Sequence, residues 1–253
     1  MPLTPAQLRI EQERTLASPR RRYGLAARAL FAAMDLVYGK ERTLEKFKVL
    51  EIVARVPYQS WEVVSYIAIT HMYPDRGFAR EMFDRVKLAR DAQDNEQYHL
   101  LILEDILQQR GRRASWVKRR LLPQLIAIPY YYTTWLMTAL RPRWAFALNA
   151  DFEDHAEHEY MAFVAEHPEF DETPVSSVFF EDYGEFATLG DLLRQIGLDE
   201  RHHKEDSLDW MRRPTSGGLL ERMQAMRTLR RAEARERATA ASRRRQTDGV
   251  SFE

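Results

Sequence analysis

Two copies of the pattern Asn/Asp-Glu-x-x-His constrain the fold of this chain more than any other feature. On an α-helix, three residues turn the chain by about 300° and rise about 4.5 Å. The Glu and the His of each copy therefore point the same way and can bind one metal ion. The two copies are Asn95-Glu96-Gln97-Tyr98-His99 and Asp199-Glu200-Arg201-His202-His203.

Each half of the chain supplies one further carboxylate at a matching distance. Glu51 precedes Glu96 by 45 residues, and Glu153 precedes Glu200 by 47 residues. Bundles that bind two iron or two manganese ions combine one Glu from each of two helices with a Glu-x-x-His pair from each of two others. The sequence therefore predicts an all-α, ferritin-like four-helix bundle with a two-metal centre. The pattern does not distinguish iron from manganese, because oxygen and imidazole ligands suit both.

Composition limits the chemistry that the chain can perform. It has no cysteine, which excludes disulfides, iron–sulfur clusters and thiolate zinc sites. The 38 basic and 38 acidic residues cancel, so global charge predicts no nucleic-acid partner. A hydrophobic content of 45% with only 10 glycines favours a helical protein.

Six helices are predicted from apolar periodicity and from proline and glycine positions. The helix over 43–72 is expected to be bent or interrupted at Pro57. The segment 121–140 is uncharged and long enough to span a bilayer, but its prolines and polar residues favour a helix that lies in the membrane interface. The predicted helices are 24–38, 43–72, 76–109, 121–140, 143–166 and 187–212.

Three regions are predicted along the chain. Residues 1–22 form an N-terminal extension without the apolar core of a secretory signal. Residues 23–212 form the helical-bundle domain, and residues 213–253 form a basic tail that is expected to be partly disordered. The expected location is the cytoplasm or the cytoplasmic face of a membrane, in a bacterial-type cell the inner membrane.

Four segments of the sequence, in order, resemble the motifs of the alternative oxidases, especially the plastid terminal oxidase branch. The match covers roughly residues 25–210 and implies a membrane-bound, non-haem di-iron quinol oxidase that reduces O₂ to water without pumping protons. It also implies six iron ligands, namely Glu51, Glu96, His99, Glu153, Glu200 and His203. The matching segments are Leu50 to Tyr58, Asn95 to Glu104, Arg141-Pro142-Arg143 leading to Phe152 to Ala156 and Tyr160, and Ala187-Thr188-Leu189 leading to Asp199 to His203.

Three further residues are candidates for roles beside the metals. Tyr160 matches a family tyrosine near the metals, a candidate redox-active or proton-donating group. It follows Glu153 by seven residues, or two helical turns, and so lies on the same helix face. Asn95 and Asp199 each precede a ligand glutamate, and either is a candidate partner for the second ring nitrogen of a ligand histidine.

The sequence also departs from the family pattern. Gly197 stands where the family has an arginine, and Lys46 stands where the family has a quinol-contacting arginine. The stretch from Pro57 to His71 is about five residues longer than in the family. Glu62 therefore rivals Glu51 as the first ligand, because eleven residues is about three turns.

A lipid-soluble quinol is expected to enter from a bilayer through the apolar segments 24–38 and 121–140, which basic residues flank. The expected partners are thus quinol, O₂ and a lipid surface on which the protein lies without crossing it, and a homodimer is implied by resemblance. The predicted substrate-binding residues are Lys46, Phe47, Leu50, Phe152, His155 and Ala156.

Two other functions remain open at this point. A di-iron hydroxylase or desaturase with a lipid-soluble substrate would use the same ligands. A helical scaffold protein whose Glu and His residues form ordinary solvated faces would use none of them.

Overall fold

The computed structural model describes residues 3–111 and 115–213, together with residues 227–228, 231 and 235. Within these residues the secondary structure is helical, and the one β-type contact is an isolated bridge between Pro174 and Thr188. The predicted all-α class is confirmed. Apart from Arg213 and the four residues after it named above, the predicted tail 213–253 lies outside the described residues.

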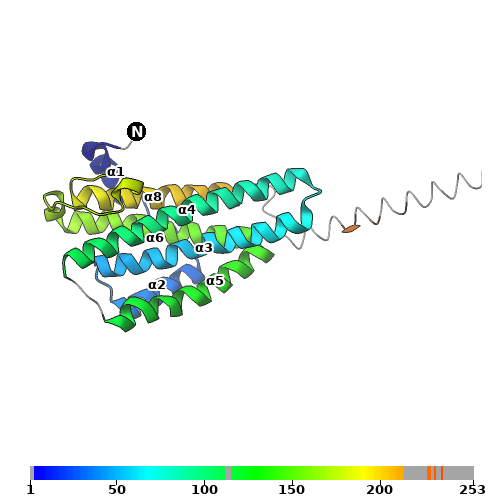
Figure 1. The fold of residues 1–253 in the computed structure, drawn as a ribbon, viewed down its shortest axis with the longest axis horizontal. Helices are drawn as coiled ribbons and strands as arrows, with labels where there is room; N and C mark the ends of the chain where they lie inside the picture. The colour runs from blue at the N-terminus through cyan, green and yellow to red at the C-terminus, as the bar shows by residue number, and fades with distance from the viewer. Residues whose placement is uncertain (1–2, 112–114, 214–226, 229–230, 232–234, 236–253) are drawn as a thin grey trace, which may run out of the picture.

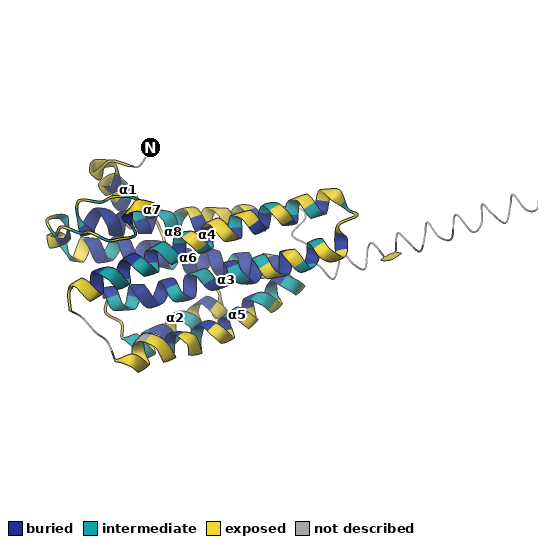
Figure 2. Cartoon of the chain, in the orientation of Figure 1, coloured by how far each residue is buried: buried dark blue, intermediate teal, exposed yellow. Residues whose placement is uncertain are grey.

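Four long helices form the bundle (Figure 1). The first pair is α3 (Leu44–Met72) with α4 (Arg76–Gln109), and the second is α6 (Pro142–Glu166) with α8 (Leu189–Arg212). Within each pair the two helices pack along much of their length, and buried side chains gather on their inner faces (Figure 2). The predicted four-helix bundle is confirmed, and each Glu-x-x-His pair lies on a different helix pair.

Side-chain caps fix where three of these helices begin. At the start of α3, the side chain of Thr43 accepts a hydrogen bond from the backbone N–H of Lys46. Asp75 accepts in the same way from Phe78 at the start of α4, and Thr188 accepts from Asp191 at the start of α8. Of the two outcomes predicted at Pro57, a bend or an interruption, the interruption is wrong, because α3 continues through this residue to Met72. The ring removes one backbone donor, but buried packing on both sides of Pro57 keeps the rest of the helix in place.

Two helices lie along one side of the bundle (Figure 1). They are α2 (Leu25–Tyr38) and α5 (Leu122–Leu140), and a π-helical turn, η1 (Val117–Leu121), leads into α5. Among the described residues, every helix falls short of the length and apolar character needed to cross a bilayer.

A helix that the sequence analysis did not predict, α1 (Pro5–Ala17), packs against α6 and α8. Its buried face is largely polar, which hides it from an apolar pattern. Gln12 donates to the backbone carbonyl of Met161 at 2.8 Å, and Thr15 donates to Glu157 at 2.6 Å. Two short helices, η2 (Pro168–Asp171) and α7 (Phe180–Tyr183), lie in the connection from α6 to α8.

Candidate metal centre

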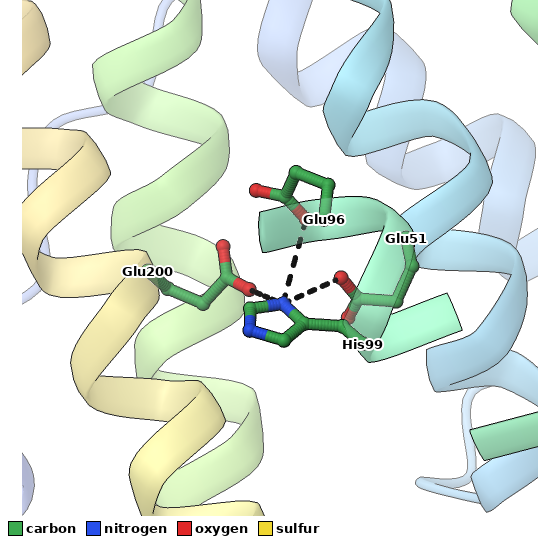
Figure 3. A group of neighbouring side chains, drawn as sticks. All are labelled: Glu51, Glu96, His99 and Glu200. Carbon is green, nitrogen blue, oxygen red and sulfur yellow. Dashed lines mark hydrogen bonds and ion pairs between the residues drawn. The ribbon is translucent and has the colours of Figure 1, made fainter. Parts of the chain in front are cut away.

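Six side chains from the four bundle helices meet in the protein interior. Five of them are fully buried, and His203 is 8% exposed. Figure 3 shows four of these side chains from three helices, with Glu51, Glu96 and Glu200 around the ring of His99. The full set is Glu51 on α3, Glu96 and His99 on α4, Glu153 on α6, and Glu200 and His203 on α8.

The six side chains form two overlapping groups, each compact enough to surround one ion. Glu51 and His99 belong to the first group, and Glu153 and His203 belong to the second. Glu96 and Glu200 belong to both, and within each group the candidate ligand atoms lie within 4.8 Å of one another. This arrangement fits a two-metal site in a helical bundle, with two carboxylates common to both groups and one Glu and His pair belonging to each.

Several ligand atoms in this centre are buried without a hydrogen-bond partner. They include the Oε2 atoms of Glu153 and of Glu200. The Nδ1 atom of His203, in contrast, lies 2.8 Å from Oε1 of Glu96, and the Nδ1 atom of His99 lies 3.4 Å from Oε1 of Glu200. Leaving a buried polar atom unpaired costs roughly 1–3 kcal/mol, and more for a charged group. Orphaned acceptors in a buried group of four carboxylates and two imidazoles fit a site whose partners are cations, and iron or manganese would satisfy them.

Electrostatics lead to the same interpretation. Burial raises the pKa of Glu51 to about 8. Burial and the neighbouring carboxylates raise the pKa of Glu153 and of Glu200 well above the ordinary value. Burial alone would raise the pKa of Glu96, but hydrogen bonds from the two histidines lower it. The protein interior thus holds more negative charge than its own groups balance, and it favours bound protons or cations.

An outer group of residues holds His99. Its Nδ1 atom faces the glutamates, 3.3 Å from Glu51, and its Nε2 atom lies 3.2 Å from Asp199. Asp199 also accepts hydrogen bonds from Tyr183 at 2.7 Å and Asn95 at 3.3 Å. Burial alone would raise the pKa of Asp199, but contact with His99 lowers it. A carboxylate on the second ring nitrogen fixes the orientation of a metal-binding imidazole.

Two buried tyrosines donate hydrogen bonds to Glu51 and Glu153, the two glutamates that belong to only one group each. Tyr160, seven residues after Glu153 on α6, donates to Glu51 on α3. Tyr58, seven residues after Glu51 on α3, donates to Glu153 on α6 at 2.8 Å. Each tyrosine thus contacts the glutamate of the opposite helix. The centre has an approximate internal symmetry that extends beyond the six candidate ligands.

Glu62 lies away from this centre. It pairs with Arg90 at 2.8 Å and accepts a hydrogen bond from Gln93 at 3.0 Å, with its side chain 21% exposed. Glu51, three turns earlier, is fully buried beside His99. Of the two rival glutamates, Glu51 is therefore the one near the other candidate ligands.

Five of the six predicted substrate-binding residues line one pocket beside the centre. Ala156 is the exception, since it lies in the apolar core that packs under the pocket. Lys46 pairs with Asp35 of α2 at 2.6 Å, and the ring of His155 stacks on Phe31 with centroids 4.0 Å apart. The five lining residues are Lys46, Phe47, Leu50, Phe152 and His155.

The sequence analysis missed several residues of the site. Tyr58 carried a signal, because the seven-residue spacing applied to Tyr160 also relates Tyr58 to Glu51. Asn149, four residues before Glu153, shared its helix face in the same way. Tyr183 lies on α7, and no periodic pattern relates it to His99. Its position depends on the tertiary path of the connection between α6 and α8.

A third acidic group, beside α1, differs from the main centre. It combines Asp154, Glu157 and His158, all buried. Its carboxylates already have cationic partners, since Glu157 pairs with Arg201 at 2.9 Å and with Lys204 at 2.5 Å. This group therefore holds α6 against α1 and α8 and lacks the orphaned acceptors of the main centre.

The fold and the centre define a class of protein, the helical bundles with a buried carboxylate and histidine centre. Within this class, the chain belongs to the alternative oxidase family. The model of that family, described as Alternative oxidase, matches residues 20–209. This is a di-iron four-helix-bundle family. The resemblance inferred from the motifs is confirmed.

One relative gives a more specific likeness. The chain is 35% identical over 131 residues to the protein named Ubiquinol oxidase 4, chloroplastic/chromoplastic, of Arabidopsis thaliana. The alignment covers 52% of this chain and 34% of the relative. It thus spans about a third of the length of that protein, and it agrees with the plastid terminal oxidase branch.

Proposed function

We propose that this protein is a membrane-associated, non-haem di-iron quinol oxidase that oxidises quinol and reduces O₂ to water without pumping protons. The observation that carries the proposal is a buried centre of four glutamates and two histidines in a chain of the alternative oxidase family. The name of the relative, a ubiquinol oxidase, supports quinol as the reductant.

The proposed cofactor is a pair of iron ions. When bound, the pair would supply two redox-active centres with open positions for O₂. The orphaned acceptors of the centre support this assignment, and the family favours iron over manganese. In the proposed centre, Glu51 and His99 would hold one ion, Glu153 and His203 would hold the other, and Glu96 and Glu200 would be available to both.

The pocket beside Glu51 is the proposed quinol site. Phe47 lines this pocket and stacks on Tyr160, with ring centroids 4.2 Å apart. Tyr160 in turn donates to Glu51. A short chain of contacts therefore joins the substrate to the centre, which supports Tyr160 as the redox-active or proton-donating residue.

Two polar residues of the pocket are proposed to bind the quinol head. Lys46 carries the positive charge, and Asp35 holds its amine. Burial lowers the pKa of His155 to about 4, so its imidazole is neutral near pH 7. A neutral imidazole has one acceptor and one donor, and Arg20 lies 3.3 Å from Nδ1 and donates to it. The Nε2–H group is then the donor that remains for an oxygen of the quinol or the quinone.

The outer faces of α2 and α5 support docking on a lipid surface. On α2, Leu25 is 80% exposed and Leu36 is 87% exposed. Exposed apolar residues recur every three or four positions from the end of η1 along α5, so they form one stripe on a single helix face. The stripe consists of Leu121, Leu125, Ile128, Tyr132, Leu136 and Leu140.

The pocket lies between α2 and the bundle, on the side of the molecule that is proposed to face the lipid. Basic residues at both ends of α5, Lys118 and Arg141, suit an anionic leaflet. We therefore infer monotopic attachment to the cytoplasmic face of a bacterial-type inner membrane, and a homodimer.

The domain division of the sequence analysis stays a prediction. The family match over residues 20–209 supports a catalytic domain at 23–212. Residues 1–22 would be an extension that α1 holds against this domain, and 213–253 would be a separate basic tail.

The test combines metal content with turnover. Protein purified in detergent should contain about two iron ions per chain and should consume O₂ only when quinol is supplied, with quinone and water as products. Iron binding with a hydroxylated or desaturated product would favour the alternative reaction. Iron far below two per chain would contradict every di-iron function.

A further inference from the structure

The carboxylate of Glu153 has two very different oxygen atoms. Its Oε1 atom accepts hydrogen bonds from Tyr58 at 2.8 Å and from the amide of Asn149 at 3.0 Å. Its Oε2 atom is buried and accepts none. One oxygen is therefore held in place by the protein, while the other is left free for a further partner.

The two donors belong to a small network that joins three helices. Tyr58 lies on α3, and Asn149 lies one turn before Glu153 on α6. The Asn149 amide nitrogen also lies 2.9 Å from the Tyr58 hydroxyl and 3.0 Å from Ser207 of α8, and its two hydrogens are shared among these three acceptors. Tyr58, Asn149 and Ser207 are all buried, so solvent does not compete for these hydrogen bonds.

We propose that Tyr58 is a positioning residue for the metal centre, and that it makes Glu153 a ligand through Oε2 alone. A carboxylate can bind a cation through one oxygen or through both. Two hydrogen bonds to Oε1 hold its lone pairs, so chelation would break contacts that nothing else in this interior replaces. The inference rests on the proposed function, since it takes Glu153 to be an iron ligand.

The hydroxyl of Tyr58 is committed in both directions, because it accepts from Asn149 and donates to Glu153. Its ring lies edge-on to His203, with centroids 5.5 Å apart. Tyr58 thus contacts both Glu153 and His203, the two residues that belong only to the second metal position. Removing the hydroxyl would leave Oε1 with the hydrogen bond from Asn149 alone. The carboxylate would then be held less firmly, which should change the coordination at one of the two positions.

The test compares Tyr58→Phe with Tyr130→Phe in the full chain. Tyr130 is a matched control, because its hydroxyl is also buried but has no hydrogen-bond partner among the described residues. Both variants and the wild type are loaded with ⁵⁷Fe(II) without O₂, and Mössbauer spectra are recorded. Iron affinity is measured by chelator competition, and the melting temperature is measured without metal.

The expected result is a shift of one of the two ferrous signals in Tyr58→Phe and of neither in Tyr130→Phe. Iron affinity should fall by roughly tenfold in Tyr58→Phe, at the low end for loss of an outer-shell partner. A lower melting temperature with wild-type spectrum and affinity would overturn the proposal, because it would mean that Tyr58 only ties α3 to α6.

If Tyr58→Phe does not fold, Asn149→Leu tests the same oxygen, and an unchanged spectrum there would also overturn the proposal. The proposed function fails separately. Wild-type protein that does not bind two irons would contradict the di-iron centre itself. Wild-type binding with an insensitive Tyr58→Phe would reject the positioning role alone.

Discussion

The two halves of the centre use the same spacing with different neighbours. Four residues before Glu153 stands Asn149, which hydrogen-bonds to Tyr58. Four residues before Glu51 stands Phe47, whose ring stacks on Tyr160. Tyr58 is thus enclosed in a polar network, while Tyr160 has an aromatic neighbour that also lines the pocket. We infer from this comparison a division of labour, in which the Glu51 half would face the substrate and the Glu153 half would fix the geometry of the metal ligands.

The largest expected effect lies where the two halves overlap. Glu96→Ala or Glu200→Ala removes a carboxylate shared by both positions, so iron content should fall from about two ions to near zero and oxygen uptake should be lost. Glu62→Ala is the control, because its carboxylate pairs with Arg90 outside the centre. Metal analysis measures the outcome. Unchanged iron in both centre variants would mean that these carboxylates bind no metal.

The next effect separates the two tyrosines. Tyr160→Phe should lower quinol-dependent oxygen uptake by roughly 100-fold, the lower range for loss of a group that moves a proton, while iron content stays near the wild-type value. Tyr58→Phe should cost less activity, because the hydroxyl of Tyr58 contacts Glu153 and Asn149, neither of which lines the pocket. Steady-state oxygen-electrode rates at matched iron content make the comparison. Equal losses in the two variants would contradict the division of labour.

The two histidines also differ, and Asp199 tests the difference. Asp199→Ala should weaken iron binding by about 10- to 100-fold, as expected when a ligand histidine loses its orienting carboxylate. The weakened ion should be the one beside His99, whose Nε2 atom contacts Asp199 at 3.2 Å. Titration with Fe(II) against a chelator measures both affinities. Loss at both positions equally would indicate a general packing defect instead.

The metal-free protein should become less stable as pH rises from about 5 to 8. Burial raises the pKa of Glu51 from 4.5 to about 8, so between these values the folded state holds a proton that the unfolded state has released. The free energy of unfolding therefore falls with rising pH, by up to about 1.4 kcal/mol for each pH unit from one such group.

Chemical denaturation at several pH values measures this trend. Iron should reverse it, because cations bind the deprotonated carboxylates. A metal-free protein whose stability rises steadily from pH 5 to 8 would show that the carboxylates of the centre are not held in the protonated form.

The smallest effect concerns the apolar face beside the substrate-facing half. Changing Leu36 and Leu125 together to serine should weaken binding to anionic lipid vesicles by on the order of tenfold, since each side chain loses part of its transfer free energy. Val178→Ser is the control, because Val178 is 78% exposed but lies outside α2 and α5. Vesicle sedimentation measures the binding. Equal effects of both changes would remove the case for docking through α2 and α5.

Much of the fold could be predicted from the sequence because long amphipathic helices carry a strong periodic signal. The helix predicted over 76–109 matches α4, Arg76–Gln109, residue for residue. The helix α1 could not be predicted in this way, because Gln12 and Thr15 bury polar groups whose partners lie more than a hundred residues away.

The centre shows the same limit. The paired Glu-x-x-His pattern predicted side chains that do meet in the interior, because both residues of each pair lie on one helix. Tyr183 could not be predicted, since it reaches Asp199 from a short helix in an irregular connection. Residues that share one helix could be predicted from their spacing in the sequence. Residues that meet only when separate segments pack together could not.

Anomalous diffraction at the iron absorption edge, from crystals of the purified protein, tests the metal centre most directly. Two peaks should lie between Glu96 and Glu200, one beside Glu51 and His99 and the other beside Glu153. Crystals with iron in the mother liquor but no peak there, or with the signal beside Asp154 and His158 instead, would contradict a di-iron centre at the bundle core.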